Sequence, residues 1–357
     1  MIASSTAYSN TIHSSAFIGV LIGVHRRFQR LWPASLVAAI AFAAHAASID
    51  PALPAYEPHA VEVPGKASWL SPEGAVTVVG YNDMRDMLEP LAARFTAAHP
   101  EVRLKLVLPG TRFAPEALAK GESAFAPMGA EFTPPQLAAY RALQREDPVA
   151  FRVAHASLDA RALSGPLAVF VHRDNPLASL TLEQVSRVFA GEACRWGDLG
   201  VEGPWAQRPI TSYGMSPGTA LAYAFKDMAM GERSIGRQMQ GLPQSADVAQ
   251  KVSQDPNAIG FAAAMRATGA ARVLALAARA GAEPVVPTEE SVVAGRYPLD
   301  RYLLIYVPRP VPPVAREFLR LILSREGQQA VASTPQKYLP LSAADAAKEL
   351  SRLELLH

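Results

Sequence analysis

Residues 167–219 constrain the fold of this chain more than any other stretch. The apolar run at 167–171 is bounded by Gly-Pro before it and by Asp-Asn-Pro shortly after it, which is typical of a buried strand closed by turns. Thr181, followed three residues later by Gln184, predicts a capping box at the start of a helix. A short strand and the tight turn at 214–219 then lead into a second helix. The stretch therefore alternates strand, helix, strand and helix.

The same alternation precedes this stretch. Strand-like runs alternate with segments whose apolar residues recur at helical spacing. Such alternation predicts parallel sheets with helices on their faces, and 357 residues leave room for about two domains. We expect strands at 75–80, 102–108, 123–128 and 149–156, and helices at 84–99, 115–120 and 134–144.

The N-terminal 46 residues have the pattern of a secretory signal. A cationic segment at 25–30 precedes an apolar core at 31–44, which is too short for an ordinary membrane-spanning helix. Ala44-His45-Ala46 has the small-x-small form of a cleavage site. A membrane anchor is the alternative. The Ser/Thr-rich residues before Val24 fit no part of a signal, so a misassigned upstream start is a further hypothesis. The signal pattern at residues 25–46 predicts export to the periplasm.

The net charge of the mature chain indicates which classes of partner it can attract electrostatically. Arginines 26, 27 and 30 are the only charged residues before Ala47, and removing them leaves 31 of 34 basic residues against 32 acidic ones, a net charge of −1. A nucleic acid or an anionic membrane therefore has no electrostatic support as a partner. The sequence also lacks a nucleophile elbow, a P-loop and a metal-spaced His/Cys cluster. We expect neither an enzyme nor a cofactor or metal.

Several segments together carry a resemblance to a known family. LAVFVHRDNPLASLTLEQVSRVFAGE at 167–192 is followed by PITSYGMSPGTALAYAF at 209–225, NAIGFAAA at 257–264 and YPLDRYLLIYV at 297–307. In this order and spacing they resemble the periplasmic phosphate-binding proteins of ABC transporters, a branch of the type II periplasmic binding fold. The similarity covers about residues 74–344.

The resemblance implies an α/β protein of two lobes, each a mainly parallel sheet flanked by helices, joined by two crossing strands. Residues 75–155 and 265–357 would form lobe 1, and residues 156–264 would form lobe 2. Residues 47–74 are rich in Pro and Ala without periodicity, so they would be an extended tether or a wrap around lobe 1. Lobe closure about the crossing strands is the expected motion. The implied partners are a small-molecule ligand and an ABC permease, and we expect a monomer.

A ligand of such a fold binds where strand-to-helix turns direct backbone N–H groups and helix N-termini into a crevice. Four turns are candidates: 80–84, 110–113, 128–132 and 213–219. They would face each other across the cleft and form a cage for an anion. The candidate ligand-binding residues are Asn82, Asp83, Thr111, Arg112, Gly129, Tyr213, Ser216, Gly218 and Thr219.

These turns depart from the family pattern. The last turn usually reads Arg-x-x-Gly-Ser-Gly-Thr, and this chain has Tyr213 in place of the arginine and Pro217 in place of the serine. Gly129 and Ala130 stand where the family carries Ser-Arg. Each lost charge-assisted hydrogen bond is worth about 1.5–3 kcal/mol, so phosphate binding of the usual kind is in doubt.

Several candidates also have a structural interpretation. Asp83, which replaces a family Ser/Thr hydroxyl, is also placed to cap a helix. Arg112, which replaces a glycine, either restores a cation to the cleft or is a solvated surface charge. Ser216 and Thr219 are expected as turn and cap residues, with donors that could also reach a ligand. Tyr213 either contacts the ligand or fills the volume left by an arginine.

Two functions stay open. The first is a cleft-closing receptor that binds a small solute, phosphate or another oxyanion among the candidates, for an ABC-type uptake system. The second is a degenerate binding or scaffolding protein of the cell envelope, which keeps the fold without an anion site.

Overall fold

The structure is a computed structural model that describes residues 49–356. The predicted signal peptide and the proposed upstream extension lie outside the described residues. Within 49–356, buried apolar side chains form two large cores, one in each of two lobes. No helix in this range is long and apolar enough to cross a lipid bilayer.

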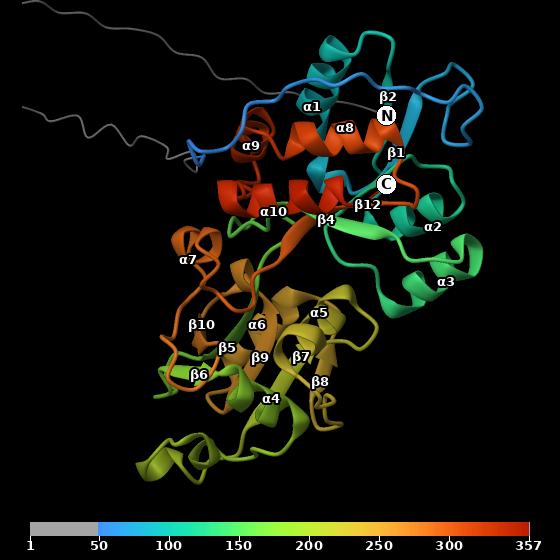
Figure 1. Cartoon of the computed structure of the whole chain (residues 1–357). Helices are drawn as coiled ribbons and strands as arrows, with labels where there is room; N and C mark the ends of the chain where they lie inside the picture. The colour runs from blue at the N-terminus through green and yellow to red at the C-terminus, as the bar shows by residue number, and fades with distance from the viewer. Residues whose placement is uncertain (1–48, 357) are drawn as a thin grey trace, which may run out of the picture. The chain divides into compact units, whose positions relative to one another are not determined.

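The first lobe is built on two groups of strands. Strand β1 (Val76–Val79) runs parallel to β2 (Leu104–Val107). Strand β12 (Tyr302–Val307) lies between β3 (Ala126–Met128) and β4 (Val149–His155) and is antiparallel to both. Figure 1 shows the helices that surround these strands: α1 (Arg85–Ala98), α2 (Ala114–Ala119), α3 (Pro134–Gln144), α8 (Pro313–Ile322), α9 (Arg325–Ala332) and α10 (Ala343–Glu354).

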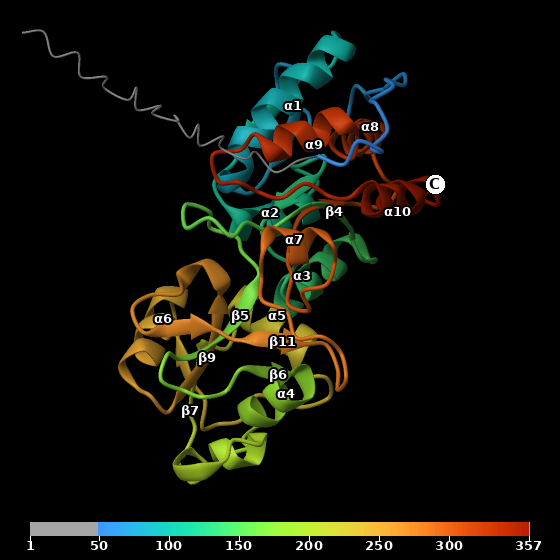
Figure 2. The ribbon, with the colours of Figure 1, turned by 90° about the vertical axis from the view of Figure 1, so that its left-hand side faces the viewer.

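The elements of the second lobe follow β4 in the chain. They are β5 (Leu167–His172), β6 (Ser179–Thr181), α4 (Leu182–Ala190), β7 (Thr211–Met215), α5 (Ala220–Ala229), β8 (Gln240–Leu242), α6 (Ser245–Gln254), β9 (Ala258–Ala263), β10 (Ala271–Val273), β11 (Ala275–Ala277) and α7 (Glu289–Val293). A mixed sheet has the order β10-β5-β9-β7-β8, and β6 and β11 pair beside each other (Figure 2).

Two local patterns in this lobe behave as predicted. The bounded apolar run is β5, and all six of its residues are buried. Thr181 and Gln184 form the predicted capping box at the start of α4, and Gly191 ends that helix with φ of +86°, a conformation that glycine adopts without strain. Local hydrogen bonding therefore sets the ends of this helix.

The sheets are mixed rather than mainly parallel, so this detail of the predicted fold is wrong. The pairs β3–β12, β4–β12, β5–β9 and β5–β10 are antiparallel, while β1–β2, β6–β11, β7–β8 and β7–β9 are parallel. Strand β4 leads out of lobe 1 and β12 leads back into it. Because these two segments run in opposite directions, they can pair directly only as antiparallel strands.

The contacts of residues 271–299 favour a later return to lobe 1 than the predicted boundary at 264/265. Strand β10 extends the lobe 2 sheet by pairing with β5, and Leu274, Leu276 and Leu299 are buried in the lobe 2 core. Tyr297 donates a hydrogen bond of 2.8 Å from its hydroxyl to the Leu167 carbonyl. We therefore propose that lobe 2 comprises residues 166–299. The remaining described residues would then belong to lobe 1.

The Pro/Ala-rich segment before β1 packs on lobe 1 in the manner of a wrap. Leu53 is fully buried, and the Pro54 carbonyl accepts a hydrogen bond of 2.7 Å from the Arg325 backbone N–H. Glu317 of α8 accepts bonds from the Tyr56 hydroxyl at 2.7 Å and from the His59 N–H at 3.0 Å. A single buried carboxylate therefore holds the segment at two points.

Replacing this carboxylate should loosen the wrap. Glu317→Ala removes the acceptor of the His59 N–H and one of the two hydrogen-bond partners of the Tyr56 hydroxyl, the other being His99 Nε2 at 3.1 Å. We therefore expect a loss of about 1–3 kcal/mol in the free energy of unfolding, measured by urea denaturation. Glu354→Ala is the matched control, because both carboxylates contact Arg320 but the Glu354 side chain is 55% exposed against 2% for Glu317. Equal losses in the two variants would contradict this account.

Candidate functional site

Three of the four predicted turns meet at one edge of lobe 1. The Gly110 N–H donates to the Gly80 carbonyl at 3.1 Å, which joins the first two turns. The Gly129 N–H donates to the Thr111 hydroxyl at 3.3 Å, which joins the second turn to the third. The Tyr81 N–H donates to the Pro127 carbonyl at 2.9 Å. The carboxyl ends of β1, β2 and β3 therefore lie together, as the sequence predicted.

Gly129 occupies a position with no room for a side chain. A Cβ atom at Gly129 would lie 2.2 Å from Cε1 of the Tyr81 ring. The Gly129 carbonyl accepts bonds from the Ser164 hydroxyl at 2.6 Å and from the Arg301 guanidinium at 3.3 Å. The serine that the family carries at this turn would thus require Tyr81 to move. Both polar backbone groups of Gly129 are already bonded to the protein.

Asp83 is bonded within the protein, and the prediction that it caps a helix is wrong. Its carboxylate is 9% exposed and accepts hydrogen bonds from the Leu163 N–H at 2.9 Å and from the Tyr338 hydroxyl. Neither the 3-10 turn Asn82–Met84 nor α1 has a side-chain cap. Burial raises the pKa of Tyr338 far above its usual range, so its hydroxyl remains a donor at neutral pH. Asp83 therefore joins the segment before β5 and the C-terminal segment around Tyr338 to the first turn.

The other two candidates on lobe 1 lie at the surface. Asn82 and Arg112 are both exposed. The Arg112 guanidinium lies 4.6 Å from the centre of the Phe113 ring, a cation–π distance. Arg112 thus keeps an exposed positive charge on the second turn.

The fourth turn, in lobe 2, starts α5. The Thr219 hydroxyl accepts a hydrogen bond of 3.2 Å from the Ala222 N–H and caps the helix, as predicted for that residue. Gly218 has φ of +88°, and the Ser216 N–H is bonded to the Leu242 carbonyl at 2.9 Å. Tyr213 is half-buried, and burial raises the pKa of its hydroxyl. Within residues 49–356, no hydrogen bond or ion pair joins this turn to the three turns of lobe 1.

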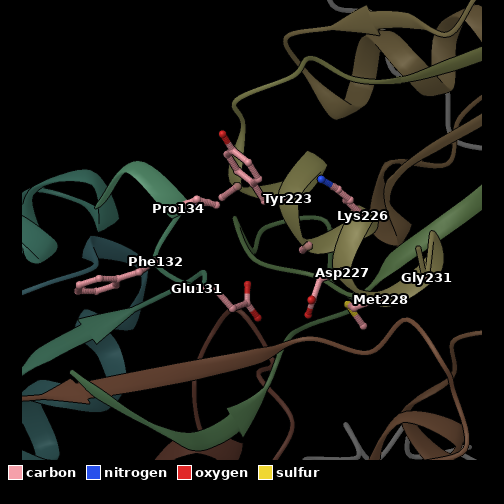
Figure 3. Close-up of a pocket in the computed structure, with 10 residues that line it drawn as sticks. Glu131, Phe132, Pro134, Tyr223, Lys226, Asp227, Met228 and Gly231 are labelled. Carbon is pink, nitrogen blue, oxygen red and sulfur yellow. The ribbon is translucent and has the colours of Figure 1, made fainter. Parts of the chain in front are cut away.

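A pocket of about 460 Å³ lies between the third turn of lobe 1 and helix α5 of lobe 2. In Figure 3 the carboxylates of Glu131 and Asp227 point into it from opposite sides. A neighbouring cavity of about 340 Å³ shares Glu131 and Asp227 and adds Arg152 and Asp300. The larger pocket is lined by Glu131, Phe132, Pro134, Ala220, Tyr223, Ala224, Lys226, Asp227, Met228 and Gly231. Of the predicted turns, only the third contributes lining residues.

Arg301 is a charged residue that the sequence did not reveal as a site residue; it lines neither cavity, but it contacts Glu131, which lines both. Its side chain is 2% exposed, and its Nη2 lies 3.4 Å from Oε2 of Glu131. Its Nε has no hydrogen-bond partner among the described residues. One feature of the sequence could have indicated it: the arginine in YPLDRYLLIYV stands immediately before a core strand, where a buried charge is unusual. Its position beside the third turn depends on the β12–β3 pairing, which the sequence did not show.

Comparisons with known proteins agree with this architecture. A family model described as the PBP superfamily domain matches residues 65–326. The phosphate-binding protein PstS of Pseudomonas aeruginosa is 32% identical over 332 residues, which cover 90% of this chain and 96% of that protein. The chain belongs to the PstS family of phosphate-binding proteins. The sequence resemblance is thus confirmed.

Other PstS-family proteins are more distant. The Bacillus subtilis phosphate-binding protein PstS is 22% identical over 276 residues, covering 75% of this chain and 81% of that protein. A crystal structure of an ABC-type phosphate transport receptor from Vibrio cholerae matches with a TM-score of 0.51 at 18% identity, covering 74% of this chain and 98% of that one. The fold is therefore the two-lobed type II periplasmic binding fold, and the chain is a phosphate-receptor-like substrate-binding protein.

The contacts of Asp83 give a testable expectation. Asp83→Ala leaves the Leu163 N–H and the Tyr338 hydroxyl without an acceptor, so we expect it to lower the free energy of unfolding by about 1–3 kcal/mol in chemical denaturation. Asp86→Ala is the control, since among residues 49–356 the Asp86 carboxylate accepts only an exposed bond from Gln336. An Asp83→Ala protein as stable as the parent would show that these contacts contribute nothing.

Proposed function

We propose that this PstS-family protein is an exported periplasmic receptor that binds a small oxyanion, with phosphate as the first candidate, and delivers it as a monomer to an ABC-type permease. The relatives that match nearly the whole chain are named as phosphate-binding proteins. A receptor of this kind binds and releases its ligand without chemical change, so we propose no enzymatic activity.

The observation that carries this proposal is the convergence of the lobe 1 turns beside a pocket that both lobes line. Gly80, Thr111 and Gly129 belong to turns that are hydrogen-bonded to one another, and the third of these turns continues directly into the pocket wall at Glu131. A pocket shared by two lobes is where ligand binding can favour one lobe arrangement over another. Of the predicted site residues, Gly129 lies two positions before Glu131, and Thr219 lies directly before Ala220, which lines the pocket from lobe 2.

One observation favours the alternative, a binding or scaffolding protein without an anion site. The Asp83 carboxylate and the Gly129 carbonyl are bonded by Leu163 and Ser164, which come from the segment before β5. Protein groups therefore take positions that the sequence assigned to ligand contacts. The two functions make opposite predictions about stabilisation by small anions.

A thermal-shift series with phosphate, sulfate, molybdate and acetate at constant ionic strength separates the two functions. A receptor gains stability as RT ln(1 + [L]/Kd), about 2.7 kcal/mol at a ligand concentration of 100 Kd, so we expect phosphate to raise the melting temperature by several degrees. Arg112→Ala removes an exposed cation from the second turn, so we expect it to reduce this shift. A melting temperature that no oxyanion changes would support the scaffold instead.

A further inference from the structure

We propose that Arg301 is the cation that holds the ligand's anionic group in the interlobe pocket, and that the Glu131 carboxylate occupies its guanidinium until an oxyanion replaces it. The inference rests on the proposed receptor function and adds to it a binding residue, a competing internal group and a ligand class. That class is a small oxyanion that presents a pair of oxygens as a carboxylate does, such as acetate or the monoanion of phosphate.

The guanidinium of Arg301 is buried and poorly paired. A buried charge is stable only with a counter-charge and hydrogen bonds to its remaining donors. Glu131 is the only carboxylate within 4.0 Å of this group among residues 49–356, and it approaches a single nitrogen at 3.4 Å. Charge-assisted bonds between arginine and a carboxylate usually measure about 2.7–2.9 Å and often use two nitrogens. Here Nε has no partner.

The adjacent acid does not supply the missing partner. Oδ2 of Asp300 lies 2.7 Å from Nδ1 of His155, and Oδ1 accepts the backbone N–H of Arg301, also at 2.7 Å. The Gly129 carbonyl contributes a contact of 3.3 Å to the same nitrogen that Glu131 approaches. The guanidinium thus retains donor capacity that an incoming oxyanion can use.

Glu131 can leave its contact with the Arg301 guanidinium at little energetic cost. Its side chain is 47% exposed, while that of Arg301 is 2% exposed. A half-exposed carboxylate that leaves the pair regains water, so its departure costs little. Glu131 also lines both cavities, which places it between the pocket and the guanidinium. An oxyanion in the pocket can therefore reach Arg301 by taking the place of the Glu131 carboxylate.

The opposite wall limits the charge of the ligand. Asp227 points into the pocket from α5, and Lys226 is the one cation among the residues that line it. Glu131 and Asp227 balance the charges of Lys226 and Arg301, so the site has no excess positive charge to offset a dianion, and like charges at close range repel strongly away from bulk water. A group with a single negative charge is compatible with this lining, and its oxygens match those of the carboxylate that it displaces.

The test is the affinity for inorganic phosphate and for acetate, measured by calorimetry on the mature protein and its variants. Glu131→Gln removes the competing charge at nearly constant shape, so we expect about tenfold tighter binding. Arg301→Lys keeps the charge but loses the planar fork, so we expect at least tenfold weaker binding. Asp227→Asn is the control on the opposite wall: any gain it gives should fade in 0.5 M salt, while the gain from Glu131→Gln should persist, because a direct contact is screened less.

Each outcome decides the proposal. If the parent binds phosphate and neither Glu131→Gln nor Arg301→Lys changes its affinity, the proposal is wrong and the receptor function stands. If neither the parent nor Glu131→Gln binds any probe, both are wrong. Binding by Glu131→Gln alone would support the proposal directly. Should Arg301→Lys fail to fold, as judged by circular dichroism, the exposed Glu131→Gln variant decides by itself.

Discussion

The backbone of Gly129 is the point on which the arrangement of lobe 1 depends. Its N–H is bonded to Thr111, its carbonyl accepts bonds from Ser164 and Arg301, and its Cα lies against the Tyr81 ring. These four partners come from four separate segments of the chain. Only a residue without a Cβ lets the ring approach so closely, since real Cβ atoms are not found 2.2 Å from a carbon. One glycine thus permits the turns of β1, β2 and β3 to meet.

The cation available to the candidate site comes from a different part of the chain than in the family pattern. In the family pattern the cations stand on the strand-to-helix turns themselves, whereas this chain has Ala130 and Tyr213 at those positions. The buried guanidinium beside the third turn comes instead from Arg301, immediately before β12. A charge carried immediately before a core strand is held more rigidly than one on a loop, and it cannot withdraw to solvent. It therefore requires a partner at all times.

Local patterns predicted most elements, and distant contacts account for what they missed. The capping box at Thr181 and the cap at Thr219 depend on residues three positions away, so the sequence revealed them. Asp83 looked like a cap for the same reason, but one of its partners, Tyr338, is 255 residues away. The pairing of β10 with β5 and the place of Arg301 likewise depend on sheet order. Hydrophobic periodicity fixes which residues are buried, but it does not say which strands become neighbours.

The position of Arg301 in the chain connects the pocket to the crossing between the lobes. Its carbonyl accepts a hydrogen bond of 2.8 Å from the Ala156 N–H, and the Leu167 N–H donates to the Leu299 carbonyl at 3.0 Å. The two segments that pass between the lobes are therefore bonded to each other on both sides of Asp300, whose carboxylate is bonded to the fully buried His155. Hinge motions are absorbed by a few residues at the ends of such segments. A ligand that draws the Arg301 side chain toward the pocket would act directly on a residue of this crossing. Ligand binding and lobe movement would then be coupled at one residue, without a longer chain of contacts between pocket and hinge.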